Sequence, residues 1–394
     1  MPDIAFFGFH SGPGGIGRVM TNLINALAAE GVAVDVLISR KDAADASLLA
    51  PGVRLIALGE GKRLGSLRPL VRYLNENRPE AVVTNKDWAT ETVVLSESFA
   101  RYRPCHVVRV GITVSQVVRS RPPGKRFAKR AALRFFYRRT DGIIGNSQGV
   151  VDDVIATTGV PKERTQVIHN PTVTPQIAER AKDAVEHPWL AGDGPPTFLG
   201  VGRLTAQKDF ATLIRAFSAV RQRRPCRLII LGEGKLRGEL EALAAALGVG
   251  DDVDLAGFSE NPFAMMRAAD LFVLSSSREG FPNVLAEAMA VGVPVVATDC
   301  PSGPMEILEG GKYGPLVPVG DAEKMANAIE TVLDAPPDPT ALRARAAEFT
   351  ASQVVHNYMA ALGLTQPGPS RDSGSAIKPL CGSNPHRKAG RLQR

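Results

Sequence analysis

The chain lacks several features that would decide its class at once. It has no run of about 20 apolar residues, so we expect no membrane-spanning helix. No basic segment followed by an apolar stretch precedes the first strand-like run at 4–9, so we expect no secretory signal. No pair among the six histidines has metal-ligand spacing, so we expect no metal site.

Cysteine is scarce, and its positions are uninformative as a framework. Cys105, Cys226, Cys300 and Cys381 have no short paired spacing. This argues against a disulfide scaffold or a zinc site and fits a reducing compartment. The net charge of +7 is moderate, and the hydrophobic content of 44% supports ordinary cores. At about 150 residues per domain, the length indicates two or three domains.

Strand-like and helical segments alternate along the chain. The expected strands are 4–9, 32–38, 81–84, 107–110, 142–145, 197–201, 227–231, 253–255, 271–275 and 294–298. The expected helices between them include 18–30, 209–223, 235–247, 261–268 and 283–291. Repeated strand–helix units predict parallel sheets covered on both faces. We therefore expect an α/β fold of two Rossmann-like, doubly wound domains that face each other across a cleft.

The most informative segment is 276–290, where a loop follows the strand at 271–275. Glu279 and Glu287 lie on either side of a Gly-Phe-Pro turn at 280–282. Gly favours turns and Pro favours a first helical turn, so Glu279 lies on the loop and Glu287 in the opening turns of a helix. Free amides at a helix start attract anions, and carboxylates accept hydrogen bonds from hydroxyls. A nucleotide sugar offers both phosphate and hydroxylated rings.

A second strand-to-helix loop carries two cations. Arg203 and Lys208 flank the turn that follows the strand at 197–201. Cations so placed can clamp a diphosphate and stabilise negative charge on a departing one. The position at a strand's carboxyl end favours phosphate binding over a solvated basic loop. The loop at 299–306 fits helix capping and ligand contact equally well.

A glycine-rich loop supplies the main rival hypothesis. Residues 12–17 fit Gly-x-Gly-x-x-Gly, and Asp35 follows about 20 residues later, as in dinucleotide-binding proteins. However, Asp35 lies in the middle of the strand at 32–38, whereas that fingerprint places the acid at a strand end. A loop that lets a substrate approach the backbone is therefore favoured over an NAD(P)-dependent oxidoreductase. His10 adjoins this loop and could reach the substrate.

A basic stretch runs from Arg119 to Arg139. It contains nine Lys or Arg and no acid, with Leu133 and several aromatic residues among them. A basic amphipathic helix of this kind suits an anionic membrane surface, and a plain solvated helix is the alternative. No RNA-binding signature accompanies it, so we expect no nucleic-acid partner.

Together these motifs resemble the group 1, family 4 retaining glycosyltransferases of the GT-B fold. The resemblance covers nearly everything from Ile4 to about Leu362 and is most specific between Gly200 and Leu333. It rests on the two glutamates around the Gly-Phe-Pro turn and on the Arg203–Lys208 loop.

The resemblance implies a role for each motif. Arg203 and Lys208 would hold the donor's phosphates, Glu279 would contact the donor sugar as the third catalytic residue, and Glu287 would hold the ribose. The other residues that it implies at the donor are Gly202, Gly257, Phe258, Gly280, Phe281, Pro282, Asn283, Val284 and Leu285. Gly14 and Gly15 would lie near the sugar and acceptor, beside His10. No metal or cofactor is implied, and no Asp-x-Asp motif is present.

The resemblance also implies a domain plan. Residues 1–170 would form the acceptor-side domain, completed by a final helix at about 351–362. Residues 171–196 would be a linker, and 197–350 would form the nucleotide-sugar donor domain. The tail at 365–394 is rich in Gly, Pro, Ser, Lys and Arg, so we expect it to be disordered.

The implied function is sugar transfer with retention from a nucleotide sugar, with a UDP-sugar favoured. The acceptor would be a glycan or lipid-linked molecule in cell-surface polysaccharide, lipopolysaccharide or glycolipid assembly. The enzyme would be cytoplasmic, either free or peripheral at the inner membrane face. Many members carry a histidine where this chain has residues 109–113 without one. A non-catalytic nucleotide-sugar- or glycan-binding protein of the same fold therefore remains an alternative.

Overall fold

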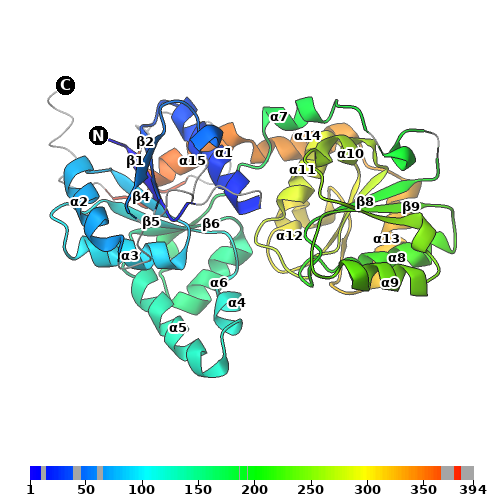
Figure 1. Ribbon diagram of the computed structural model, residues 1–394, viewed down its shortest axis with the longest axis horizontal. Coiled ribbons are helices and arrows are strands. Elements are labelled where there is room, and N and C mark those ends of the chain that lie inside the picture. The colour runs from blue at the N-terminus through cyan, green and yellow to red at the C-terminus, as the bar shows by residue number, and fades with distance from the viewer. Residues whose placement is uncertain are drawn as a thin grey trace. The chain divides into compact units, whose positions relative to one another are not determined.

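The protein consists of two compact α/β units. The computed structural model describes residues 1–9, 15–38, 46–59, 65–185, 187–192, 194–364 and 377–382. One unit is formed by Met1–Pro171 with Ala351–Arg394, and the other by Thr172–Thr350. Each contains a parallel sheet with helices packed on its faces (Figure 1). The predicted fold of two Rossmann-like units is confirmed.

The first unit contains a seven-stranded sheet in the order β3-β2-β1-β4-β5-β6-β7. Its strands are β1 (Ile4–Phe7), β2 (Val34–Ile38), β3 (Arg54–Ala57), β4 (Ala81–Thr84), β5 (Cys105–Val110), β6 (Gly142–Gly145) and β7 (Thr165–Val167). The chain order reverses between β1 and β4. The loops after these two strands therefore diverge at the carboxyl edge, where such sheets bind ligands.

Helices cover both faces of this sheet because its strands are apolar on both sides. They are α1 (Gly15–Ala29), α2 (Leu67–Asn77), α3 (Asp87–Glu97), α4 (Val114–Arg119), α5 (Pro123–Tyr137), α6 (Gln148–Thr158) and α15 (Ala351–Leu362). In β1, Ile4 and Phe6 join the core beneath α1 and α15, whereas Ala5 and Phe7 join the core beneath α2 and α3. The last helix, α15, lies against α1 and so completes the first unit (Figure 1).

The second unit contains a six-stranded sheet in the order β10-β9-β8-β11-β12-β13. Its strands are β8 (Thr197–Val201), β9 (Arg227–Leu231), β10 (Val253–Gly257), β11 (Leu271–Leu274), β12 (Val295–Thr298) and β13 (Leu316–Val317). Its helices are α7 (Pro175–Arg180), α8 (Phe210–Arg221), α9 (Arg237–Ala246), α10 (Pro262–Ala268), α11 (Asn283–Val291), α12 (Pro304–Ile307), α13 (Ala322–Asp334) and α14 (Pro339–Ala346). Here the order reverses between β8 and β11, which brings the loops after these strands together.

The segment expected as a linker is largely built into the second unit. Helix α7 lies within it, and Ile177 is buried in the core beside α10 and α11. Val173 forms a parallel bridge with Thr350, so the two ends of the second unit meet. The burial of Ile177 and the backbone bridge of Val173, rather than the prolines of this segment, therefore mark where the second unit begins.

The expectation that the cysteines stay unpaired is wrong. Cys105, at the start of β5, forms a disulfide with Cys381. Residues 377–382, expected to be disordered, pack on the first unit, where Leu380 and Cys381 are buried. The Leu380 amide donates to the Ala361 carbonyl at 2.8 Å. Spacing could not reveal this pair, because 276 residues separate the two cysteines. The rest of the tail, 365–376 and 383–394, lies outside the described residues.

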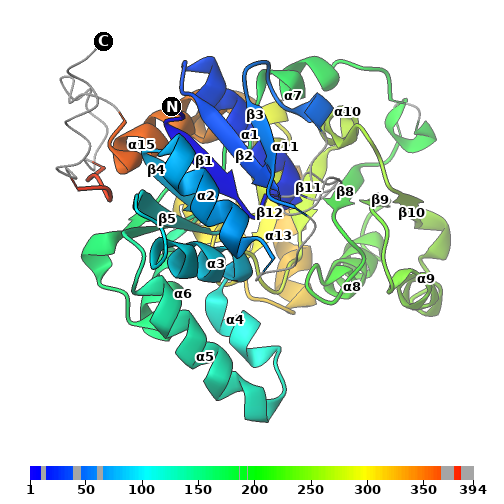
Figure 2. The same cartoon turned by 60° about the vertical axis from the view of Figure 1, so that its left-hand side comes forward.

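The basic stretch begins at Arg119, the last residue of α4. After residues 120–122 it continues through the whole of α5. The two helices project from the first unit beside α6 (Figure 2). Leu133 and Tyr137 anchor α5 in a core, and Lys129 pairs with Asp87 of α3 at 2.6 Å. Across the described parts of the chain, no helix has both the length and the apolar character needed to cross a bilayer.

Candidate functional site

Lys208, expected at the donor's phosphates, meets Glu279, expected at the donor sugar, at the carboxyl edge of the second sheet. Lys208 lies on the loop between β8 and α8, and Glu279 lies on the loop between β11 and α11. The Lys208 Nζ is 2.6 Å from the Glu279 Oε1. The two side chains are only 17% and 9% exposed, so water screens the pair weakly.

Neighbouring polar groups fix both members of this pair. The Ser276 hydroxyl donates to the same Glu279 oxygen at 2.7 Å. Asp209 adopts a left-handed conformation with φ 46° and caps α8, because its carboxylate accepts from the Thr212 amide. Backbone strain of this kind persists only where the surroundings enforce it. The conformation of Asp209 therefore orients the adjacent Lys208.

Backbone hydrogen bonds join the two loops directly. The Ser277 amide donates to the Gln207 carbonyl at 2.8 Å, and the Gln207 side chain donates to the Arg278 carbonyl at 3.0 Å. The Ser275 hydroxyl donates to the Lys208 carbonyl at 2.7 Å. Sequence reasoning missed Ser276 and Gln207, although the run of three serines after β11 was a usable signal.

Helix α11 begins beside the pair and supplies backbone donors. Its N-cap is Pro282, whose side chain offers no capping oxygen, so the first amides of the helix are not capped by it. Phe281 is buried and packs edge-on against Phe349, with ring centroids 5.3 Å apart. Glu287 lies one turn into α11 and is only 3% exposed. Helix starts of this kind attract anions.

Several glycines at this edge of the second sheet let neighbouring segments of the protein pack closely against their backbone. A Cβ on Gly202 would lie 3.0 Å from the Lys208 Cε, and one on Gly232 would lie 1.9 Å from the Gly202 carbonyl oxygen. Gly257 has φ +81° and accepts from the Gly232 amide at 2.6 Å. The next residue, Phe258, is 66% exposed, so its ring is available for stacking. Arg203 is exposed on the same loop as Lys208.

The loop at 299–306 supports the Gly-Phe-Pro turn. Gly303 has φ +96°, and a Cβ there would lie 2.5 Å from the Pro282 Cδ and 3.1 Å from the Gly280 carbonyl oxygen. The adjacent Cys300 thiol is buried, and burial raises its pKa to about 12, so it is a protonated packing group at neutral pH. Helix capping and ligand contact were the two alternatives for this loop. Capping by a side chain is not observed, because the N-cap of α12 is Gly303, and ligand contact stays a prediction.

In the first unit, the structure describes only some of the predicted site residues. His10 and Gly14 lie outside the described residues, whereas Gly15 is the exposed first residue of α1. Beyond β5, where related proteins are expected to have a histidine, the Gly111 carbonyl accepts from the Asn146 amide group at 3.3 Å. The nearest charged side chain on the strand is Arg109, 4% exposed, which donates to the Asn170 Oδ1 at 2.5 Å.

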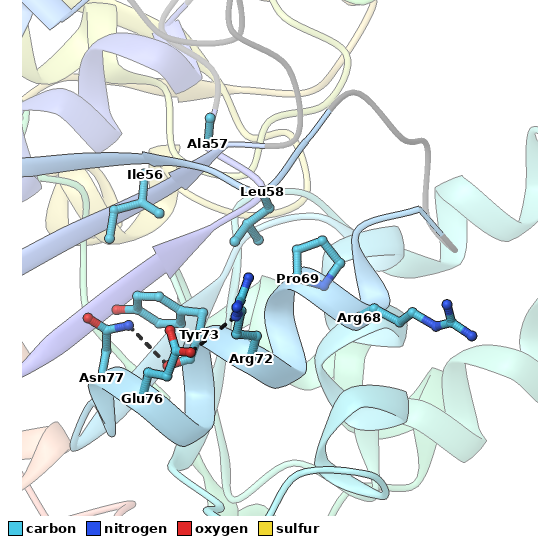
Figure 3. Close-up of a pocket in the computed structure, with 9 residues that line it drawn as sticks. All are labelled: Ile56, Ala57, Leu58, Arg68, Pro69, Arg72, Tyr73, Glu76 and Asn77. Atoms are coloured by element: carbon cyan, nitrogen blue, oxygen red, sulfur yellow. Dashed lines mark hydrogen bonds and ion pairs between the residues drawn. The ribbon is translucent and has the colours of Figure 1, made fainter.

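Asp35, the acid that the nicotinamide hypothesis requires, already accepts hydrogen bonds from other side chains. Arg54 donates to both Asp35 oxygens at 2.7 Å, and the Tyr73 hydroxyl donates to one of them at 2.5 Å. Figure 3 shows Tyr73 in a cavity of about 450 Å³, where Arg72 pairs with Glu76 at 3.1 Å. Asp35 is 1% exposed, so it holds β2, β3 and α2 together rather than a ribose.

The comparisons with known proteins agree with this geometry. Residues 14–171 match the family described as glycosyl transferase 4-like domain, and residues 182–349 match glycosyl transferases group 1. Between them the two families cover both units. The chain belongs to the group 1 glycosyltransferases and has their GT-B fold.

Two curated relatives illustrate the similarity. The chain is 32% identical over 204 residues to the N-acetylgalactosamine-N,N'-diacetylbacillosaminyl-diphospho-undecaprenol 4-alpha-N-acetylgalactosaminyltransferase of Campylobacter jejuni, covering 51% of this chain and 53% of the relative. It is 36% identical over 214 residues to the lipopolysaccharide core biosynthesis glycosyltransferase LpsE of Rhizobium meliloti, covering 54% and 58%. The alignments thus span little more than half of either relative.

The structural match to one solved protein covers nearly the whole of both chains. HepE of Anabaena in complex with UDP superposes with a TM-score of 0.73 over 93% of this chain and 100% of that one. The sequence identity is 20%, so this likeness speaks for the fold alone.

We predict that Gly303→Ala destabilises the second unit by about 1–3 kcal/mol, since it adds a clash to a strained backbone angle. It should also weaken nucleotide binding by displacing the turn at 280–282. Gly320→Ala is the matched control, because Gly320 has φ +79° but nothing within 4 Å of its Cβ position. Chemical unfolding and UDP titration of both variants test this. Equal losses in the two would show that Gly303 does not support the turn.

Proposed function

We propose that the protein transfers a sugar from a nucleotide-sugar donor to a glycan or lipid-linked acceptor. The observation that carries this proposal is the 2.6 Å Lys208–Glu279 contact beside the start of α11. It places a cation, a carboxylate and helix-end amides within one small region. A sugar diphosphate presents the complementary groups, namely phosphate oxygens and sugar hydroxyls.

The pair suggests how donor binding proceeds. Without donor, Lys208 and Glu279 neutralise each other. When a diphosphate arrives, its oxygens take over Lys208, with Arg203 and the amides of α11 completing the clamp. Glu279 is then free to accept a hydrogen bond from a sugar hydroxyl. Positive charge near the leaving diphosphate would stabilise it as the bond to the sugar breaks. We propose that these cations serve in place of a divalent metal.

For the donor we propose a UDP-sugar, and for the stereochemistry, retention. The printed descriptions of the similar proteins support this choice, since HepE is described as a complex with UDP. The relatives described as acting on a diphospho-undecaprenol glycan and in lipopolysaccharide core biosynthesis support a role in surface glycan or glycolipid assembly. A binding protein without turnover is the second candidate, favoured by the absence of a histidine at residues 109–113.

We predict that Lys208→Ala and Glu279→Ala each lower the rate of nucleotide-sugar turnover by about 10²–10³-fold, because each removes a group aimed at developing charge or at the sugar. Lys312→Ala is the control. Lys312 pairs with Glu309 at 3.0 Å in the same unit, but on the surface. Turnover is measured over a panel of UDP- and GDP-sugars, with nucleoside diphosphate release as the readout.

Three outcomes separate the candidates. Selective loss in the two site variants supports the transferase. Donor binding without release, in the wild-type protein and with every sugar and acceptor tried, would favour the binding protein. Wild-type rates in both site variants would contradict the roles of Lys208 and Glu279.

We also propose that the protein works in the cytoplasm at an anionic membrane surface, through the outer face of α5. Lys125, Arg126, Arg130 and Arg134 are exposed there, and Phe127 is 83% exposed. A basic helix with an exposed aromatic ring suits a surface of anionic lipid headgroups. This position would bring a lipid-linked acceptor to the enzyme.

We predict that Lys125→Glu combined with Phe127→Ala weakens binding to vesicles of phosphatidylglycerol and phosphatidylcholine more than tenfold. Reversing one charge changes the attraction by roughly 2 kcal/mol, to which the lost ring adds. Phe99→Ala, at another exposed ring of the first unit, should leave binding unchanged. Co-sedimentation at low and high salt measures both. Unchanged binding of the double variant would rule out α5 as the contact.

A further inference from the structure

The first unit contains a cavity on the edge of its sheet opposite to the one that carries Gly15. It has a volume of about 690 Å³, and Arg103, Arg138, Arg139, Arg164, Glu97 and Leu380 are among the residues that line it. These residues lie where β5, β6 and β7 begin, not where they end. β5 has six residues, so the cavity is roughly 20 Å from the carboxyl edge of the sheet. It is therefore separate from the predicted sugar and acceptor loop.

Three of the four arginines donate to backbone carbonyls. Arg103 donates to the Arg139 carbonyl at 3.3 Å, and Arg164 donates to the Arg138 carbonyl at 3.4 Å. Arg139 donates to the Phe135 carbonyl at 2.9 Å and stacks on that ring. Carbonyl oxygens orient a guanidinium but leave its charge uncompensated. Arg103 also lies 3.6 Å from the Glu97 Oε2.

Two acids, Glu97 and Asp141, line the cavity with the four arginines, so they offset only part of this charge. Glu97 is only 7% exposed, and burial raises its pKa to about 8 against the opposing effect of Arg103. It is therefore largely protonated at neutral pH. Its Oε1 has no hydrogen-bond partner among the residues that the structure describes. Asp141 already accepts from the His106 amide at 2.8 Å, and burial lowers the pKa of the His106 ring to about 3, so that ring is neutral.

The C-terminal segment forms one wall of the cavity. Leu380 is held there by the neighbouring Cys105–Cys381 disulfide and by the hydrogen bond that its amide donates to the Ala361 carbonyl. Gly142 makes room for it, since a Cβ at that position would lie 2.7 Å from the Leu380 Cβ. Gln166 also donates to the Lys378 carbonyl. The cavity is thus built partly from a segment that returns from the far end of the chain.

We propose that this cavity binds a phosphate-bearing ligand. Guanidinium groups match phosphate oxygens in a bidentate manner, and several of them converge here with little competing negative charge. A protonated Glu97 carboxyl can donate one further hydrogen bond to the anion. The volume exceeds that of a bare phosphate and suits a small phosphate ester or a lipid headgroup.

The direct test is calorimetric titration of the full chain with inorganic phosphate. Arg138→Ala combined with Arg164→Ala should weaken the phosphate affinity at least tenfold. Arg101→Ala is the matched control, because Arg101 is exposed in the first unit but neither lines the cavity nor lies on α5. Any phosphate bound at the donor site contributes equally in all three proteins. Equal affinity in the double variant and the wild type would overturn the proposal.

Two further variants test the same site. Cys381→Ser changes the C-terminal wall of the cavity, and Glu97→Gln changes its buried acid. Cys381→Ser, which releases the wall, should weaken phosphate binding several-fold. Between pH 7 and 9, ionisation of Glu97 should weaken binding of sulfate, which does not titrate in this range. Arg103 and Asp141 are the charged groups that act on Glu97, and the His106 ring beside it stays neutral because burial lowers its pKa to about 3. Glu97→Gln should remove this pH dependence. If both variants behave as the wild type, the cavity is not the site.

Vesicles distinguish the two sources of phosphate. If the ligand is a lipid headgroup, the variant with both Arg138→Ala and Arg164→Ala should bind vesicles of phosphatidic acid and phosphatidylcholine more weakly than the Arg101→Ala control does. If the ligand is a soluble ester, the double variant should lose inorganic phosphate while its vesicle binding stays at the wild-type level.

Discussion

A shielded ion pair at the carboxyl edge of the second sheet is the contact on which the predicted chemistry depends. Lys208 and Glu279 come from different loops, 71 residues apart in sequence, and meet at 2.6 Å. A shielded pair of this kind is stable only when further hydrogen bonds support it, and Ser276 provides one. The pair can exist because the strand order reverses between β8 and β11 and brings their loops together. The topology of the sheet thus positions the residues that a sugar diphosphate would need.

The two edges of the first sheet differ in the charge they carry. The carboxyl edge carries the start of α1 and the buried Arg109. The amino edge carries the arginine cavity, with the C-terminal segment as one wall and the disulfide beside it. The two edges could therefore bind different ligands.

The sequence predicted the strands, turns and helix starts of the proposed donor side well, because short motifs there carry local geometry. The start of α11 at Asn283 follows from a Gly-Phe-Pro turn, and the Lys208 loop begins at Gly202, directly after β8. The disulfide escaped prediction because it joins residues at distant positions, and spacing rules see only near ones. The arginine cavity escaped for a similar reason, since Arg103, Arg138 and Arg164 converge only when β5, β6 and β7 align. For Asp35, the mid-strand position already counted against a cofactor role, but the pattern could not show that Arg54 and Tyr73 donate to its carboxylate.

The most direct test of the central claim is a crystal structure of the protein with UDP. The account predicts that the diphosphate lies within hydrogen-bonding distance of the Lys208 Nζ and of the first amides of α11, with Glu279 released from Lys208. A complex in which UDP binds elsewhere while Lys208 and Glu279 remain 2.6 Å apart would contradict it.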